Sequence, residues 1–289
     1  MKKVNFLMLL IGSVFITSCI GQNDTINQWN EYELKGKIQS LKISEYTAIE
    51  KFGEITKDSL KYSKIVYFNK KGLVDSITYY EDDDDKLRST EIYKWDFTNN
   101  TCTITIKEDP TFYLLLQYNA LFNRLLSQVS YKNDSISGKQ TRSYNELLQL
   151  IDLTVYRENG DIWWREKDHE YSDDGKLIRY SSYDEEGELD CAYSYRYNDD
   201  GILIGMKRET DWSKNKYTYE YDSKNMLCRE IWEYKSKSKY SNYSSTDITE
   251  YTYQIDKIGN YLVKTKKSYD KDDIDEAEYE YTEREIIYY

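Results

Sequence analysis

Residues 195–203 read YRYNDDGIL, and this short pattern predicts the architecture of most of the chain. Tyrosines alternate with other residues, then Asn, Asp and Gly follow, and an apolar pair comes next. Alternation with a period of two is typical of a β-strand with one drier face, and Asn, Asp and Gly favour tight turns. The pattern therefore predicts two antiparallel strands joined by a short turn.

The same pattern recurs along the chain as an aromatic residue, a turn-forming residue and then Gly or Asn. Copies begin at Phe68, Phe97, Tyr118, Tyr144, Tyr171, Tyr197, Tyr221, Tyr253 and Tyr281. Their successive spacings run from 21 to 32 residues, so a period near 26 covers almost all of residues 65–289. A second turn follows within most periods, as at Asn159-Gly160. Each period therefore predicts two strands.

This count gives a β-meander of seventeen to twenty strands. Open sheets of more than about ten strands curl, split or flatten. We therefore expect an all-β fold, an antiparallel β-meander of repeated hairpins that forms an elongated, curved or spiralling sheet. Neighbouring units would supply most of its stability, as in a solenoid. The pattern leaves open whether the sheet stays open or closes on itself.

Residues 110–129 admit two interpretations. Asp109-Pro110 is a good helix start, and apolar residues from Leu114 to Val129 fall at helical spacing. The phase of the repeat, which passes through Tyr118-Asn119, instead indicates strands. We favour strands, because they continue the period on both sides.

The repeat resembles that of YD-repeat, or RHS-like, proteins, whose units run Tyr-x-Tyr-Asp-x-x-Gly-x-Leu. Residues 195–203 and 219–227 carry the match best, with Asn225 in place of Gly. The stretches LKGKIQSL at 34–41 and EKFGEI at 50–55 are similar to the start of bacterial repeat lipoproteins of this kind. The resemblance implies a β-repeat scaffold. It does not imply the closed cargo shell or the self-cleavage of RHS proteins proper, since the chain is too short and shows no such protease core.

Composition excludes several functional classes. The 289 residues include 52 Asp and Glu against 40 Lys and Arg, a net charge of −12, and they contain no basic block. Nucleic-acid binding is therefore not expected, because neutralisation of phosphates supplies most of that affinity. The 32 tyrosines supply aromatic rings that can form a folded core, and they favour half-buried strands.

The N-terminus predicts export and lipid attachment. Lys2 and Lys3 precede an apolar stretch from Phe6 to Ile16, which is too short to span a bilayer. The following Ile16-Thr17-Ser18-Cys19 resembles a bacterial lipobox, which implies cleavage after residue 18 and lipidation of Cys19. We therefore divide the chain into a signal peptide (1–18), a flexible tether (19–30) and a Tyr-rich β-hairpin repeat domain (31–289). The alternative is a plain secretory signal with an incidental Cys19.

Three cysteines remain in the body of the chain, Cys102, Cys191 and Cys228. Neighbouring strands lie about 4.8 Å apart, so Cys191 and Cys228, about three strands apart in a single sheet, are too distant to form a disulfide. We expect buried, unpaired thiols.

Catalytic and metal-binding patterns are weak. The single histidine, His169, is expected on the strand face opposite Asp168 and Glu170, which makes a poor chelate, so we interpret it as a solvated strand residue. The acidic segments 82–85 and 270–275 do not match a calcium-binding loop and read as solvated turns. No phosphate-binding loop or nucleophile elbow is present in the sequence. We expect no cofactor and no enzymatic activity.

Two groups of residues are candidates for binding. Trp163, Trp164, Trp212 and Trp232 could stack on a glycan, although consecutive Trp163 and Trp164 must face opposite sides of a strand. The apolar C-terminus, with Ile286, Ile287, Tyr288 and Tyr289, could form an edge strand that binds a partner by strand addition. We favour the interpretation that this segment closes the sheet or packs into the core.

The sequence as a whole predicts an envelope lipoprotein that acts as a non-enzymatic interaction scaffold for a protein partner. It would attach to the membrane, most simply the outer membrane, through the lipid on Cys19, and either side of that membrane is possible. The first alternative is a tethered carbohydrate-binding protein, which exposed coplanar aromatic rings would reveal. The second is a hydrolase, which two converging carboxylates with one raised pKa would reveal.

Replacing Cys19 by alanine tests the anchor. We expect Cys19→Ala to abolish labelling by a radioactive fatty acid and to release the protein from the membrane fraction, because burial of acyl chains stabilises attachment by about 0.8 kcal/mol per methylene. Unchanged retention in the membrane fraction would contradict lipidation at this position.

Overall fold

The computed structural model describes residues 27–81, 86–237 and 243–289. They form eighteen β-strands in one sheet and a short 3₁₀ helix, η2 (Asn30–Tyr32). The strands are β1 (Ile38–Lys51), β2 (Glu54–Phe68), β3 (Val74–Glu81), β4 (Lys86–Asp96), β5 (Thr101–Ile106), β6 (Asp109–Tyr118), β7 (Leu125–Lys132), β8 (Ser135–Tyr144), β9 (Leu150–Tyr156), β10 (Ile162–Tyr171), β11 (Leu177–Tyr183), β12 (Leu189–Tyr197), β13 (Leu203–Glu209), β14 (Ser213–Tyr221), β15 (Leu227–Ser236), β16 (Ser244–Ile255), β17 (Tyr261–Asp270) and β18 (Asp273–Tyr288).

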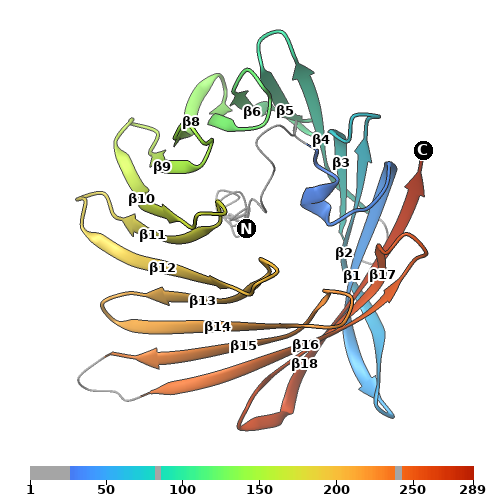
Figure 1. Cartoon of the computed structure of the whole chain (residues 1–289). Helices are drawn as coiled ribbons and strands as arrows, with labels where there is room; N and C mark the ends of the chain where they lie inside the picture. The colour runs from blue at the N-terminus through green and yellow to red at the C-terminus, as the bar shows by residue number, and fades with distance from the viewer. Residues whose placement is uncertain (1–26, 82–85, 238–242) are drawn as a thin grey trace, which may run out of the picture.

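Each strand pairs antiparallel with the next, so the predicted all-β meander is confirmed, and its eighteen strands fall within the expected range. The sequence left open whether the sheet closes on itself, and β18 also pairs with β1, so the expected elongated, curved or spiralling sheet is instead a closed barrel (Figure 1). Closure leaves no free edge among the described strands. A long twisted meander can close into a barrel in this way, because its accumulating twist and coiling bring its first and last strands together.

The C-terminal segment is therefore not an edge strand. Ile286 and Ile287 lie opposite Leu41 and Ser40 of β1, and Tyr288 lies opposite Ile38. The backbone amide of Tyr289 donates to the Lys37 carbonyl at 3.0 Å. The strand-addition site predicted at Ile286, Ile287, Tyr288 and Tyr289 is already filled by the chain's own first strand, which matches the favoured interpretation that this segment closes the sheet.

The repeated turns have one geometry. In the turn between β12 and β13, the amide of Asn198 donates to the Ile202 carbonyl, and the amide of Ile202 donates back to the Asn198 side-chain oxygen at 2.8 Å. Gly201 completes this turn at φ +78°, in the left-handed region that a residue with a Cβ rarely adopts. The turn therefore favours Asn, Asp or Ser at its first position, because their side-chain oxygen accepts a backbone hydrogen bond. It favours Gly near its end because of the positive φ.

Tyrosine hydroxyls connect successive repeats at the end of the barrel where the repeated turns lie. The last tyrosine of a repeat donates its hydroxyl to the carbonyl of the leucine that begins the preceding odd-numbered strand. These pairs are Tyr144 to Leu125 (2.9 Å), Tyr171 to Leu150 (2.7 Å), Tyr197 to Leu177 (2.9 Å) and Tyr221 to Leu203 (2.8 Å). Each bond joins a hairpin closed by one repeat turn to the hairpin closed by the preceding repeat turn. The repeated tyrosine therefore links neighbouring hairpins in addition to packing on its own strand.

Residues 109–132 form strands β6 and β7, which confirms the strand interpretation over the helical one. The helical spacing of Leu114 and its neighbours has another cause. Leu114, Leu116 and Tyr118 point to one side of β6 and are buried together with Cys102, Ile104 and Phe122. Cys102, Cys191 and Cys228 are all free, as expected; Cys102 and Cys191 are also buried, whereas Cys228, on β15, is only partly buried, so burial is confirmed for two of the three.

The two faces of the barrel wall differ in character. The segment that precedes β1 lies inside the barrel (Figure 1), where Leu41, Ile43, Val66 and Ile77 pack in one buried cluster with its Trp29. Residues 27–30 were predicted to belong to the flexible tether, whereas Trp29 is only 7% exposed and donates its indole N–H to the Ile38 carbonyl. The folded body therefore begins before residue 31.

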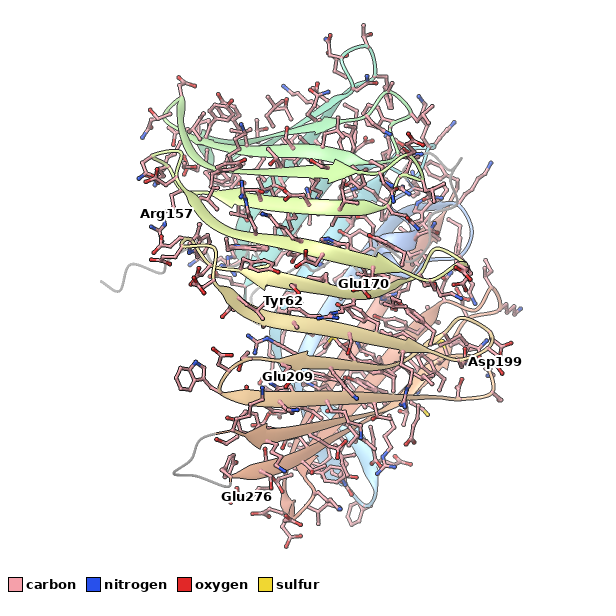
Figure 2. All side chains as sticks on the ribbon, turned by 60° about the vertical axis from the view of Figure 1, so that its left-hand side comes forward. Tyr62, Arg157, Glu170, Asp199, Glu209 and Glu276 are labelled. Atoms are coloured by element: carbon pink, nitrogen blue, oxygen red, sulfur yellow. The ribbon has the colours of Figure 1, made fainter. Side chains whose placement is uncertain are left out.

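Outward positions carry charged and hydroxylated side chains. On β12–β15 the outward charged and hydroxylated residues are Ser194, Arg196, Lys207, Glu209, Lys214, Lys216, Thr218, Glu220, Arg229, Glu233 and Lys235, and Ala192, Gly205 and Ile231 share that face. Several pair across strands, such as Arg229 with Glu220 at 3.7 Å. Figure 2 shows Glu170 and Glu209 on this outer wall, with Arg157 and Asp199 at its opposite rims. No helix within the described part of the chain is long and apolar enough to cross a membrane.

Removing the hydroxyl of a repeat tyrosine should destabilise the barrel. We expect Tyr197→Phe and Tyr221→Phe each to lower the free energy of unfolding by about 1 kcal/mol, because each leaves a part-buried carbonyl without its donor. Urea unfolding measures this difference. Tyr131→Phe is the matched control, since Tyr131 stacks on Tyr113 and its hydroxyl makes no hydrogen bond to another described residue. Equal stability of Tyr197→Phe and Tyr131→Phe would refute the role of the hydroxyl.

Candidate functional site: the inner wall of the barrel

The four predicted tryptophans do not form one site. Trp163, at the start of β10, is 40% exposed, whereas Trp164 is half-buried, as expected for neighbours on opposite faces of a strand. Trp212 lies in the turn between β13 and β14 and is 78% exposed. Trp232 points inward from β15 and donates its indole N–H to Asn215 at 2.9 Å. Cys19 lies outside the described residues.

Trp232 contributes to a recess of about 230 Å³ on the inner wall. The register of β14–β17 places its lining side chains together, because Tyr217 lies opposite Trp232, Trp232 opposite Asp247, and Tyr251 opposite Lys266. The lining residues are Tyr217, Glu230, Trp232, Asp247, Thr249, Tyr251 and Lys266. Aromatic rings, carboxylates, a hydroxyl and an ammonium group therefore meet in one place.

The rings and carboxylates of the recess have a defined arrangement. The rings of Tyr217 and Trp232 are nearly parallel, with centroids 6.3 Å apart and planes at 12°. Glu230 accepts a hydrogen bond from the Tyr251 hydroxyl at 3.3 Å. Burial and the neighbouring carboxylate of Asp270 raise the pKa of Asp247. Two nearly parallel aromatic rings thus lie beside groups that donate and accept hydrogen bonds.

A second group of aromatic rings lines β10–β12. Tyr180 stacks on Tyr193, with centroids 4.5 Å apart and planes at 11°, and the His169 ring stacks on Tyr180 at 5.4 Å. The interpretation of His169 as a solvated residue is wrong, because its side chain is only 1% exposed. The strand register shifts between Lys167 and Glu170, and Asp168 adopts φ +56° there, so simple alternation does not apply.

Buried charges lie next to this histidine. Burial raises the pKa of Glu166 to about 7, and the positive charge of Arg142 only partly opposes that shift. Burial likewise lowers the pKa of Arg142 and of His169, so His169 is neutral at neutral pH. The Glu166 carboxylate and the His169 Nε2 are 4.0 Å apart.

Cations on the opposite part of the inner wall are already engaged. The guanidinium of Arg284 lies 3.5 Å from the centroid of the Tyr261 ring and donates to the Tyr32 carbonyl at 3.1 Å. Lys264 lies 5.7 Å from the same ring, and burial lowers its pKa. The Arg284 hydrogen bond to Tyr32 fastens the N-terminal segment to the wall, which is a structural role.

Metal binding finds no support among the residues that the structure describes, which contain no group of three potential ligands. The acidic turn after β17 uses the Asp270 carboxylate to accept a hydrogen bond from the Asp272 amide at 2.8 Å, as expected for a turn. Residues 82–85, the other acidic segment, lie outside the described part.

Sequence reasoning missed Tyr217, Glu230, Asp247 and Lys266 as partners of Trp232. The sequence analysis did not assign these residues to one face of their strands, and that assignment is what brings them together. Counting back by twos from repeat tyrosine Tyr221 reaches Tyr217, which faces inward. Once the inward side of a strand is known, the sequence shows which charged residues lie on that side.

Comparisons with known proteins give limited likenesses. No family model and no curated protein matches the sequence. Among solved structures, a porin-like protein from Bacteroides uniformis is 11% identical, with a TM-score of 0.47, over 86% of this chain and 96% of that one. The Photorhabdus luminescens Tc holotoxin pore is 14% identical over 76% of this chain, with a TM-score of 0.29. The crystal structure of TcdB2-TccC3-TEV is 12% identical over 82% of this chain, with a TM-score of 0.31.

This chain spans only 15% of the length of each of these last two matched chains. Likenesses at these TM-scores establish neither a family nor a function. The resemblance to YD-repeat proteins therefore stays a prediction from the motif.

The buried Glu166 should make stability depend on pH. In the unfolded chain a glutamate ionises near pH 4.5, whereas folded Glu166 ionises near pH 7. The unfolded state thus loses its proton first, and folding becomes less favourable as the pH rises from 4.5 to 7 and then levels off. We expect Glu166→Gln to gain on the order of 2 kcal/mol relative to wild type across that interval.

Urea unfolding at pH 4.5 and pH 7.5 measures the gain. The control is Glu170→Gln, on the outer wall, which should follow the wild-type profile. A pH-independent difference between Glu166→Gln and wild type would contradict the burial of an uncompensated carboxyl group.

Proposed function

We propose that this protein is a lipid-anchored envelope protein whose β-barrel binds a carbohydrate on its inner wall, without enzymatic activity. The observation that carries the proposal is the recess on β14–β17, where the nearly parallel rings of Tyr217 and Trp232 lie beside Glu230, Asp247 and Lys266. The carbon-bound face of a sugar ring stacks on such aromatic surfaces, and its hydroxyls donate to carboxylates and accept from ammonium groups. Binding sites typically combine an apolar wall with a few polar groups in this way.

Closure of the sheet favours the inner wall over an edge or an outer face as the binding surface. A sheet with no free edge offers no place for strand addition. Barrels of 16–18 strands are too wide for side chains to fill, so ligand can enter. The inward aromatic residues of β12 and β14, such as Tyr195 and Tyr219, are only half-buried.

The outer wall supports attachment through a lipid rather than insertion of the barrel. A membrane-spanning barrel presents an apolar band about 25 Å tall to the lipid. The outward Lys216, Glu233 and Arg229 of this barrel would instead require burial of charge in hydrocarbon. We therefore propose that the barrel stands in water beside the outer membrane and that the lipid on Cys19 holds it there.

The path of the N-terminal segment supports one orientation. The amide of Gln28 donates to the Gly72 carbonyl, and the amide of Lys35 donates to the Asn260 side chain at 2.6 Å, so this segment crosses the rim formed by the repeat turns. Asp199 marks that rim in Figure 2. The tether would then place this rim toward the membrane and the Arg157 rim away from it.

A second candidate function is hydrolysis of a glycosidic bond. Glu230 lies opposite Thr249 and Trp232 opposite Asp247, so the two carboxylates are diagonal neighbours on one face, and the pKa of Asp247 is raised. A pair of carboxyl groups with one raised pKa is the arrangement that glycosidases use. We favour binding alone, because Glu230 already accepts a hydrogen bond from Tyr251 and no further groups orient the pair.

Substitution in the recess tests carbohydrate binding. In affinity electrophoresis through gels that contain single polysaccharides, we expect at least one polysaccharide to retard the wild type. Trp232→Ala should weaken that retardation at least tenfold, because it removes the stacking surface. Trp212→Ala, which alters an exposed turn, should behave as wild type. Equal retardation of the two variants, or no retardation by any polysaccharide, would contradict the proposal.

Release of reducing ends from the retarding polysaccharide separates binding from hydrolysis. We expect none with the wild type. Release that disappears in both Glu230→Gln and Asp247→Asn would establish the hydrolase instead.

A further inference from the structure

Exposed apolar side chains line part of the rim that the repeat turns form. Leu121, in the turn between β6 and β7, and Leu147, in the turn between β8 and β9, are 58% and 56% exposed. Phe97, between β4 and β5, and Ile258, between β16 and β17, are exposed as well. Contiguous apolar residues on a surface mark a place of contact with a partner or a membrane.

Charge divides this rim into two arcs, because successive hairpins are neighbours in the closed sheet. The apolar arc consists of the turns 256–260, 69–73, 97–100, 119–124 and 145–149. Its turns hold four basic and two acidic residues. The acidic arc consists of the turns 172–176, 198–202 and 222–226, which hold five acidic and two basic residues and, among the described residues, no exposed large apolar one. An anionic bilayer surface attracts the first arc and repels the second.

Side-chain contacts join the turns of the apolar arc to one another. Nζ of Lys71 lies 4.0 Å from the centroid of the Phe97 ring, and that ring packs on Phe122 with centroids 5.2 Å apart. Arg124 donates from Nε to the Leu148 carbonyl at 2.8 Å and so links its own turn to the next one. A surface held together in this way loses little conformational entropy when it docks.

The N-terminal segment meets the rim within the apolar arc. The amide of Gln28 donates to the Gly72 carbonyl at 2.9 Å, and a Cβ added at Gly72 would lie 2.6 Å from the Asn27 side chain, so the segment packs directly on this turn. Asn27 follows Cys19 by eight residues, which span at most about 29 Å when fully extended. A lipid on Cys19 would therefore hold the apolar arc close to the bilayer.

The Arg157 rim also exposes apolar residues, but acidic residues surround them. Leu189 follows the turn 184–188, which contains four acidic residues, and Trp212 follows Asp211. Insertion of these side chains into an anionic interface would bring carboxylates against charge of the same sign. The two rims thus differ in charge rather than in the presence of apolar side chains.

We propose that the apolar arc docks on the bilayer that holds the lipid of Cys19, with Phe97, Leu121 and Leu147 inserted among the headgroups and the lysines of the turn 69–73 against anionic phosphates. The strands stay in water, and the barrel tilts so that the acidic arc, which Asp199 marks in Figure 2, is held away from the surface. This deepens the proposed function and rests on one part of it, the lipid on Cys19. It is independent of carbohydrate binding.

Fluorescent probes on equally exposed leucines test which rim meets the bilayer. Leu121→Cys, Leu147→Cys and, on the Arg157 rim, Leu189→Cys would each carry the environment-sensitive fluorophore NBD, in a Cys228→Ser background because the other described cysteines are buried. The acylated protein is reconstituted into vesicles of phosphatidylcholine and phosphatidylglycerol. We expect the emission at positions 121 and 147 to rise about twofold and to be quenched by spin-labelled lipid, because apolar side chains of an anchored protein enter the interface. The emission at position 189 should not change.

Quenching at position 189, or at none of the three positions, would overturn the proposal. Mass spectrometry of the same sample separates this failure from a failure of the anchor. An acylated Cys19 with all three probes in water would leave the anchor standing and overturn the docking of the arc alone. An unmodified Cys19 would refute the anchor and, with it, the bilayer as the surface that the arc contacts.

Two lysine variants test the contribution of charge. Lys70→Glu, in the apolar arc, should reduce the quenching of the probe at position 121 about twofold on vesicles that contain phosphatidylglycerol and leave it unchanged on pure phosphatidylcholine. Lys224→Glu is the matched control, because Lys224 is also an exposed turn lysine but lies in the acidic arc, and this variant should behave as the parent protein. Equal effects of the two substitutions would overturn the contact between this arc and anionic lipid.

Discussion

The pairing of β18 with β1 is the contact on which the rest of the structure depends. It joins Leu41 to Ile286 and Lys42 to Glu285 across almost the full length of the chain, and it places Tyr281 edge-on to Tyr46. Ion pairs reinforce the outside of this seam, as between Lys57 and Glu283 at 2.8 Å. Without the seam, β1 and β18 would each expose one edge of unpaired backbone, and the sheet would not enclose an interior.

Closure also explains how so polar a chain folds. Deep burial is concentrated on the inner wall of β1–β6, where the segment around Trp29 and the apolar residues near Leu116 pack. Elsewhere inward tyrosines are half-buried, and bonds such as Tyr197 to Leu177 hold hairpin to hairpin. The recess that we propose to bind ligand lies on this half-buried part of the wall, on β14–β17.

Local patterns were sufficient to predict the hairpins but not the barrel. Period-two alternation and Asx–Gly turns act within about ten residues, so they predicted the meander, the strands at 109–132 and the free cysteines. The contact of Ile286 with Leu41 has no local signature, so the sequence offered an edge strand beside the favoured interpretation that this segment closes the sheet or packs into the core, and could not identify its partner strand. His169 was misplaced because the irregularity at Asp168 interrupts alternation, and Arg142 resembled any other strand charge until the inner face was known.

Disulfide formation across the seam is the most direct test of the closed barrel. Lys42 and Glu285 face each other on the outer wall, so Lys42→Cys with Glu285→Cys, in a Cys228→Ser background, should oxidise within one chain in the native state. Pairing Lys42→Cys with Glu233→Cys, on β15, should give no such bond. The account predicts a monomeric, faster-migrating species for the first pair alone. Folded protein that forms only links between chains, or none, would contradict closure.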